Sequence, residues 1–307
     1  MKNSLILHHY ENSPYAEKIR LMFGLTNSHW YSSLTSVQPP RPSVDPLTGG
    51  YRRIPVAQLG ADIFCDTALI AQEVASMTKA AALDVNTLDE PTLALMQQAE
   101  KEAFFAAIGA VPPMRLLGTM LRSFGPIGMY RFAKDRAGMM KGSSVRAPKG
   151  EAAIASIRSL IDNMESRLEL HAWIAGDEPS IADFATYHPL WLYVFCNRRE
   201  LDAGTRVKDW YRRVAQIGHG NREEISKADV FKMAHQNEPR ALPENDAEES
   251  ALIGKAVAVA PSDYGMNAVE GNLVACTKDR IIVQRETNDF GNLHVHFPKA
   301  GYSLTAK

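Results

Sequence analysis

The apolar residues of this chain change their spacing twice, and this change restricts the fold more than any other feature of the sequence. Residues 1 to about 80 mix short apolar runs with turn residues, whereas residues 90 to about 235 repeat apolar residues at helical spacing. In the tail, residues 293–297 alternate apolar and polar side chains, which is the period of a strand. The sequence therefore predicts an α+β protein with a mixed, a helical and a β-rich part in that order.

Three domains are expected on this pattern: residues 1–80, 90–238 and 245–307. The stretch PRALPENDAEES at 239–250 is polar, acidic and proline-bearing, which is typical of a linker. Roughly four strands are expected in the tail. Because a few short strands are marginal alone, we expect the tail to pack onto the helical domain or onto a dimer partner.

The first part has the order strand, helix, loop, hairpin, helix. A strand is expected at Leu5–Leu7, and Ser13-Pro14 is a typical helix start, since Ser caps free N–H groups and Pro suits the first helical position. Apolar runs on both sides of a turn at 60–62 predict a hairpin. A second helix is expected to begin at Asp66-Thr67.

Charge and cysteine content limit the partners and the compartment. Lys and Arg number 34 against 35 Asp and Glu, a formal charge of −1, which argues against nucleic acid or an anionic membrane as partner. The three cysteines are far apart, which fits a reducing cytoplasm and excludes a disulfide scaffold. No segment offers about 18 uninterrupted apolar residues, so no membrane span is expected.

Three local motifs lie in a recognisable order. The first is Asn12-Ser13-Pro14-Tyr15, the second is Arg53-Ile54-Pro55-Val56 followed by Asp66-Thr67, and the third is Trp173-Ile174-Ala175-Gly176 leading to Ser180-Ile181-Ala182-Asp183. Together they resemble the cytosolic glutathione S-transferase family over about residues 3 to 235. The tail lies outside that pattern.

The resemblance implies a thioredoxin-like glutathione-binding domain, an all-helical domain that supplies the acceptor pocket, and a homodimer that serves detoxification. The small β-rich C-terminal extension would be additional. Adaptable apolar pockets are often built from methionine and aromatic side chains. One stretch of the helical half is rich in them: Met114, Met120, Phe124, Met129, Tyr130, Phe132, Met139 and Met140.

Two hydroxyls are candidates for the catalytic group. A free thiol has a pKa of about 8.5, and a helix N-terminus or a hydroxyl donor lowers it. Ser13 is placed for both effects, although a plain helix cap also explains Ser-Pro. Tyr10, at the end of the first strand, is the rival, because some classes of the family use a tyrosine near that point. Position 13 is not cysteine, so thiol-transfer chemistry is not expected.

The remaining candidates would hold the tripeptide. Ile54-Pro55 resembles the family's cis-proline turn, which would present the Ile54 backbone to the cysteinyl part of glutathione. Asp66 would face the γ-glutamyl ammonium, and Thr67 would hold its carboxylate at a helix N-terminus, a natural anion site. Arg53, or its neighbour Arg52, could pair with the glycine carboxylate.

Other motifs are expected to be structural. Ser180 and Asp183 have capping-box spacing, and Cys65 is expected to be a small buried side chain. His294 and His296 lie two residues apart on one strand face, but no third ligand has suitable spacing, so no metal is expected.

The sequence thus predicts an enzyme that binds glutathione and adds its thiolate to a small hydrophobic electrophile, without a metal. A non-catalytic glutathione-binding or interaction module on the same fold remains an alternative. A glutathione-dependent ether lyase or dehalogenase is a third, because these reactions share the thiolate step.

Overall fold

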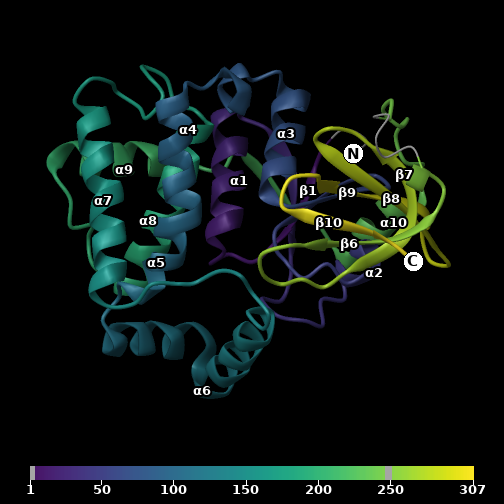
Figure 1. Cartoon of the computed structure of the whole chain (residues 1–307), viewed down its shortest axis with the longest axis horizontal. Coiled ribbons are helices and arrows are strands. Elements are labelled where there is room, and N and C mark those ends of the chain that lie inside the picture. The colour runs from purple at the N-terminus through teal and green to yellow at the C-terminus, as the bar shows by residue number, and fades with distance from the viewer. Residues whose placement is uncertain (1–3, 246–250) are drawn as a thin grey trace.

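A computed structural model describes residues 4–245 and 251–307 of the chain (Figure 1). Its first unit is thioredoxin-like: β1 lies parallel to β2 and antiparallel to β3, which forms a hairpin with β4. The predicted order of elements is confirmed, except that the sequence analysis missed the strand β2. The elements are β1 (Ile6–His9), α1 (Pro14–Leu25), β2 (His29–Leu34), α2 (Asp45–Thr48), β3 (Val56–Leu59), β4 (Asp62–Cys65) and α3 (Thr67–Thr78).

The second unit is helical, as predicted. Residues 90–109 form one nearly continuous helical segment with a π-helical turn at its centre, and Gly125, at φ 64°, breaks the long α6 into two arms. Its elements are η1 (Ala81–Leu83), η2 (Val85–Thr87), α4 (Glu90–Gln97), η3 (Gln98–Ala103), α5 (Phe104–Gly109), α6 (Pro113–Met139), α7 (Glu151–Leu168), α8 (Ile181–Asn197) and α9 (Thr205–Ile217).

Strands from two later parts of the chain extend the N-terminal sheet at both edges: β5 and the helix α10 lie within residues 90–238, which were expected to be all-helical, and the other strands come from the tail. The strand β5 pairs with β2, and β9 pairs in parallel with β4, so that one sheet runs in the order β10-β6-β7-β8-β9-β4-β3-β1-β2-β5. These elements are β5 (Asn221–Glu224), α10 (Lys227–His235), β6 (Ala256–Pro261), β7 (Val269–Cys276), β8 (Arg280–Thr287), β9 (Gly291–Pro298) and β10 (Tyr302–Ala306).

The tail was expected to pack onto the helical domain or a dimer partner; its main partner in the structure is the N-terminal sheet, and the loop at 262–266 contacts the helical unit. Without β9, the strand β4 would be an edge with unpaired N–H and C=O groups, and pairing satisfies them. Five strands are found after residue 251, one more than expected. Part of the predicted linker, 246–250, lies outside the described residues, and 239–245 has no regular structure.

The sheet separates two apolar cores. Leu7 and Trp30 pack toward α1, α3 and the helical unit, while their neighbours Ile6 and Tyr31 pack toward α10 and the C-terminal strands. This alternation is what a sheet covered on both faces requires. In Figure 1 the yellow strands accordingly extend the sheet away from the helical half.

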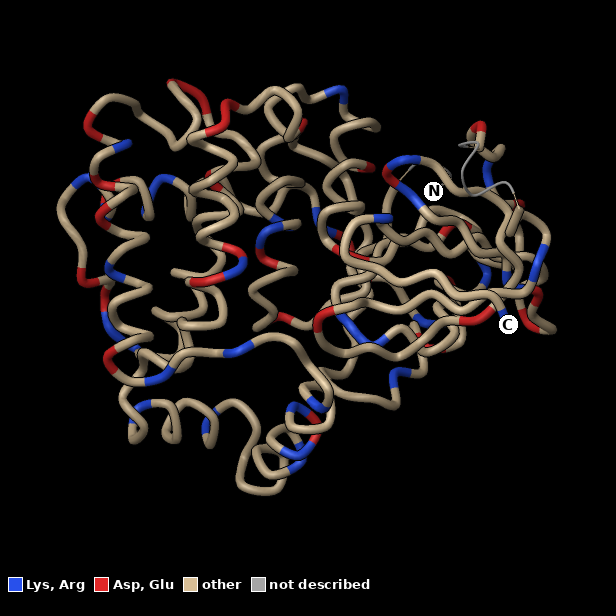
Figure 2. The backbone as a smooth tube through the Cα atoms, in the orientation of Figure 1, with Lys and Arg blue, Asp and Glu red and all other residues tan. Residues whose placement is uncertain are grey.

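Charge and hydropathy agree with the sequence analysis. Figure 2 shows basic and acidic residues interspersed over both halves of the molecule. No single helix in 4–245 or 251–307 is long and apolar enough to cross a membrane. The helical segments 90–109 and 113–139 reach the necessary length and hydropathy only when they are taken together, and the chain bends by 93° between them.

Candidate active site

Ser13 caps the first helix from a fully buried position. Its Oγ accepts a hydrogen bond from the Ala16 N–H at 3.2 Å, and its own N–H donates to the Tyr10 carbonyl at 3.1 Å. Because Oγ acts as acceptor in the cap, the hydroxyl proton is still available, and none of the described residues accepts it. Ser13 therefore combines a helix N-terminus with an unused donor.

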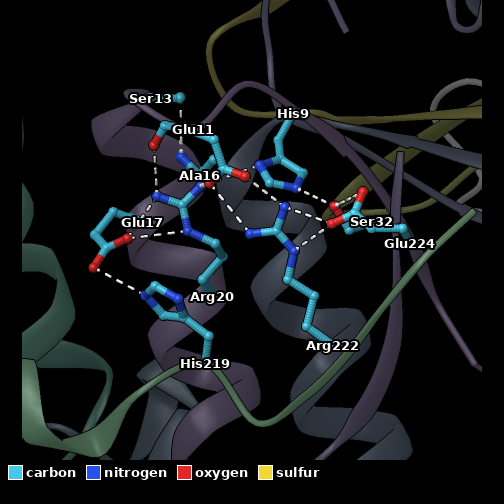
Figure 3. A network of polar contacts seen from close by, with 10 residues as sticks. All are labelled: His9, Glu11, Ser13, Ala16, Glu17, Arg20, Ser32, His219, Arg222 and Glu224. Carbon is cyan, nitrogen blue, oxygen red and sulfur yellow. Dashed lines mark hydrogen bonds and ion pairs between the residues drawn. The ribbon is translucent and has the colours of Figure 1, made fainter. Parts of the chain in front are cut away.

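A charged network beneath α1 fixes the turn that carries Ser13 (Figure 3). Arg20 donates to Glu17 at 2.6 and 3.0 Å and to the Glu11 carbonyl at 2.9 Å. Arg222, from β5, donates to the Glu11 carboxylate at 2.5 and 3.2 Å. The residues before and after Ser13 are thus tied to α1 and to the added strand.

His9 completes this network as a neutral side chain. Arg20 donates to its Nδ1 at 3.0 Å, so the ring proton is on Nε2, which lies 3.0 Å from the Ser32 hydroxyl. Ser32 in turn donates to Glu224 at 3.2 Å. Burial, reinforced by the charges of Arg20 and Arg222, lowers the pKa of His9 to about 3.

Tyr10 is half-buried directly after β1, and its carbonyl accepts the Ser13 N–H. The residue before it, His9, accepts the Thr35 N–H at 2.8 Å, just before the proline-rich loop at 37–50. A buried arginine of that loop, Arg41, donates to the carbonyls of Arg52, Ser36 and Val37 at 2.9 to 3.2 Å. The backbone next to Tyr10 is therefore tied both to Ser13 and to the start of this loop.

The cis-proline turn and the start of α3 have the backbone forms that the resemblance implied. The Ile54–Pro55 peptide bond is cis, and no hydrogen bond to the Ile54 backbone is found within 4–245 and 251–307. Asp66 caps α3 with φ at 81°, a region that side chains rarely adopt and that is concentrated at functional sites. The Thr67 side chain is half-buried at the first position of that helix.

The Asp66 carboxylate contacts residues far apart in the sequence. Its Oδ1 accepts from the Ala68 N–H at 3.0 Å, and its Oδ2 accepts from the Tyr302 hydroxyl at 3.0 Å. Tyr51 lies 2.6 Å from the Tyr302 oxygen and serves as its donor. Arg53 lies 3.6 Å from Oδ2. Two predicted residues, Arg53 and Asp66, are thus brought together with a tyrosine of the last strand.

Both candidate arginines already have carboxylate partners. Arg53 donates to Asp263 and, at 2.7 Å, to the Tyr264 carbonyl, and the Tyr264 ring lies 4.1 Å from its guanidinium carbon. Arg52 donates to Asp135 of α6 at 2.5 Å. The partner of Arg53 comes from the C-terminal extension, and that of Arg52 from the helical unit.

Aromatic contacts close the space between the three parts of the chain. The Tyr264 hydroxyl lies 3.4 Å from that of Tyr15, and the Tyr15 ring packs on Phe104 at 4.4 Å. Phe105 meets the Tyr264 ring at 5.7 Å. Burial raises the pKa of Tyr15 well above its usual value, so its phenol is neutral.

The sequence analysis missed Asp263, Tyr264 and Tyr302. Asp263 and Tyr264 have one local signal, a tyrosine between an Asp and a Gly in a turn of the tail, and Tyr302 begins the strand β10. That signal predicts a turn and does not say where the turn docks.

Comparisons with known proteins agree with this geometry. The profile described as Glutathione S-transferase, N-terminal domain, matches residues 7–79, and the one described as Glutathione S-transferase, C-terminal domain, matches 147–213. The chain belongs to the glutathione S-transferase family. The search of curated proteins finds no match.

One solved structure resembles the chain over its whole length, including the extension. It is described as a GST-like protein from Pseudomonas syringae, with 29% identity, a TM-score of 0.76, and coverage of 99% of this chain and 100% of that one. A glutathione S-transferase from Pseudomonas fluorescens has 16% identity and a TM-score of 0.46, and covers 68% of this chain and 93% of its own.

A third match, a glutathione S-transferase from Methylobacillus flagellatus with glutathione bound, has 18% identity and a TM-score of 0.42, and covers 70% of this chain and 92% of its own. The last two likenesses are too weak to bear on the site.

A cavity along α3 adjoins the site at one residue. It has a volume of about 470 Å³ and begins at Ala68, beside Thr67. The ion pair between Lys18 and Glu100 lies in its wall. None of the eight methionine and aromatic residues expected in an acceptor pocket lines it, and Met114 is 77% exposed.

The predicted structural motifs behave as expected. The Ser180–Asp183 capping box is confirmed, and Asp183 also accepts from the Ile174 N–H and the Trp210 indole at 2.9 and 2.8 Å. Cys65 is buried, and burial raises the pKa of its thiol.

The argument that His294 and His296 lack a third partner is wrong. Asp62 of β4 lies opposite His294 in the parallel pairing, and its Oδ1 is 2.7 Å from the His296 Nε2. All three side chains are buried with ligand atoms within 4.8 Å of one another. However, Arg240 approaches the other Asp62 oxygen with its backbone N–H at 3.0 Å and its Nε at 3.4 Å.

Proposed function

We propose that this glutathione S-transferase family member is an active glutathione transferase. The unused hydroxyl proton of Ser13, at the N-terminus of α1, is the observation that supports it most directly. A donor aimed at a thiol favours the thiolate, and the helix dipole acts in the same direction. The thiolate then attacks a small hydrophobic electrophile, and the protein needs no metal for this step.

The remaining predicted residues have complementary tasks in this proposal. The Ile54 backbone pairs with the cysteinyl unit of glutathione, and Thr67 with the α3 N-terminus receives the γ-glutamyl carboxylate. Asp66 faces the γ-glutamyl ammonium, and Arg53 receives the glycine carboxylate. Tyr10 is the alternative hydroxyl. We further propose that the protein is a cytoplasmic homodimer that acts in detoxification.

One observation favours a second function, a non-catalytic glutathione-binding or interaction module. Ser13 is fully buried, and Arg53 is held by the extension, so access to the site is restricted. An ether lyase or dehalogenase would use the same thiolate and differ only in its acceptor.

Retention on glutathione–agarose, followed by a conjugation assay with a generic aromatic electrophile, distinguishes these functions. The transferase proposal predicts both retention and turnover. Retention without turnover would favour the module, and a protein that is neither retained nor active would refute both. The full-length Asp279→Asn variant, which changes an exposed residue in the turn between β7 and β8, serves as the control for preparing a variant protein.

A further inference from the structure

The loop at 262–266 reaches from the extension to the proposed glycine-carboxylate receptor. Its Asp263 carboxylate accepts from Nη2 of Arg53, and the Tyr264 carbonyl accepts from the same nitrogen at 2.7 Å. The Arg53 Nε is buried and has no partner among the described residues. Since Nε and Nη2 form the edge that binds a carboxylate through two parallel bonds, this edge is only half used.

Hydrogen bonds hold both the loop backbone and the Asp263 side chain. The Gly265 N–H donates to the Met139 carbonyl at 2.9 Å, and the Ser144 N–H donates to the Asp263 carbonyl at 3.0 Å. The Asp263 side chain is 42% exposed, whereas that of Arg53 is 14% exposed. The Asp263 Oδ1 also accepts a hydrogen bond from the Tyr264 N–H at 2.9 Å, so the carboxylate is held at Arg53 while one side of it is open to solvent.

Among the described residues, the neighbouring guanidinium groups of Arg52 and Arg41 have partners of their own, and of their buried nitrogen atoms only the Nη1 of Arg52 is left without one. Arg52 pairs with Asp135 at 2.5 Å, and Arg41 is used by backbone carbonyls. A ligand carboxylate that binds this edge of Arg53 would have to displace Asp263, both to gain Nη2 and to reach the buried Nε.

We propose that Asp263 is a specificity-determining residue, because its carboxylate competes with the glycine carboxylate of glutathione for the Nε–Nη2 edge of Arg53. Asp263 thereby reduces the extra affinity that the glycine carboxylate gives to glutathione over a thiol that lacks this group. This inference rests on the proposed function.

The test compares two thiols on three proteins. Binding of glutathione and of γ-glutamylcysteine, which lacks the glycine unit, is measured by calorimetry on wild type, Asp263→Asn and the matched control Asp279→Asn. Asp263→Asn should bind glutathione about two- to fivefold more tightly, as expected for loss of one partly exposed charged competitor. Its affinity for γ-glutamylcysteine should stay at the wild-type value, and the control should match wild type for both ligands.

The outcomes distinguish a failure of the competition by Asp263 from a failure of the proposed function. Equal glutathione affinity in wild type and Asp263→Asn would overturn the competition, as would tighter binding of both thiols or weaker binding of glutathione. If the folded wild type and the variant bind neither thiol, the proposed function itself fails, and the inference fails with it. Circular dichroism of each variant establishes that the comparison is between folded proteins.

Discussion

At the scale of single residues, the Ser13 hydroxyl carries the sharpest prediction. Ser13→Ala removes one hydrogen bond to a charged thiolate, worth roughly 1.5–3 kcal/mol, which is about one to two pKa units of the bound thiol. The rate at neutral pH should fall about ten- to a hundredfold, with a smaller change in glutathione affinity. Ultraviolet titration of bound glutathione measures the thiol pKa directly.

Tyr10→Phe is the paired control for this measurement. Because the proposal assigns the activating hydroxyl to Ser13, loss of the Tyr10 hydroxyl should leave the bound-thiol pKa near the wild-type value. A raised pKa in Tyr10→Phe together with an unchanged one in Ser13→Ala would assign the activating hydroxyl to the tyrosine. The Ser13 cap itself contributes about 1 kcal/mol of stability, so unfolding is measured in parallel.

Three buried histidines make the free energy of unfolding depend on pH. Burial lowers the pKa of His8 and of His188 to about 4, and that of His9 to about 3. In the unfolded chain these groups titrate near 6.5, so the unfolded state binds more protons below that pH. The neutral histidines contribute their full stabilisation above pH 6.5. This stabilisation is lost as the pH falls toward 4, and at pH 5 the free energy of unfolding is lower by roughly 2 kcal/mol for each histidine.

Denaturant unfolding at pH 7.5 and 5.0 measures this loss. His8→Gln should reduce the pH dependence, because one of the three groups no longer titrates. His235→Gln, on the exposed end of α10, should leave it unchanged. A free energy of unfolding that is the same at both pH values would show that the histidines are not held neutral.

At the scale of elements, the junction of β4 and β9 depends on a polar pair. Burial favours the neutral Asp62, but the hydrogen bond from His296 together with the backbone N–H and the charge of Arg240 outweighs it and holds the pKa of Asp62 below its usual value. Both carboxylate oxygens already have donors. We therefore expect that this cluster joins β4 to β9 through hydrogen bonds and binds no divalent ion.

His296→Phe keeps a ring against Phe64 but leaves Asp62 with one donor fewer, so it should cost about 1–3 kcal/mol. His294→Phe, on the same strand without a side-chain hydrogen bond in the described structure, should cost less. Dialysis against EDTA should not change the Tm of the wild type. A lower Tm after EDTA, restored by Zn²⁺, would instead identify the cluster as a metal site.

Elements that depend on residues close together in the sequence could be predicted, whereas elements that depend on distant residues could not. The Ser13 cap, the hairpin and the Ser180 box are set by neighbours a few residues apart, and all were predicted. The strand β2 was missed because its sequence, HWYSSL, has consecutive polar residues. Ser32 is tolerated in the sheet interior because His9 and Glu224 bond to its hydroxyl, and both are distant in sequence.

At the scale of the whole molecule, the extension is part of the fold. Truncation after Glu238 would uncover the β4 edge and one of the two apolar cores. We expect a Tm lower by about 10 °C or more, or aggregation, since each lost kcal/mol lowers Tm by about 2–4 °C in a chain of this class. Calorimetry and light scattering measure this.

A chain cut by protease within 241–245 is the matched control, because that stretch is exposed and irregular. The two pieces should stay associated and keep a Tm close to that of the intact chain. A truncated protein with unchanged Tm and kinetics would show that the extension is dispensable.

The sequence also could not predict where the C-terminal extension docks on the rest of the molecule. The alternation in residues 293–297 predicts a strand but does not name its partner, and Asp62 and His294 are paired across more than two hundred residues. The three site residues from the extension were missed for the same reason, whereas Arg53 and Asp66 were found because their motif is local.

The long-range pairing of β9 with β4 sets an order in time for a chain made from its N-terminus. A growing chain can complete β1 to β4 and the helical unit while residues 291–298 are still unsynthesised, so the edge of β4 waits uncovered during that interval. Contacts of such sequence separation form slowly, and transiently unpaired strands are where growing chains associate with one another. The time between the synthesis of β4 and that of β9 therefore determines how long each newly made molecule can associate through this edge, so slow synthesis of residues 66–290 would lower the yield of correctly folded protein more than slow synthesis of the residues before β4.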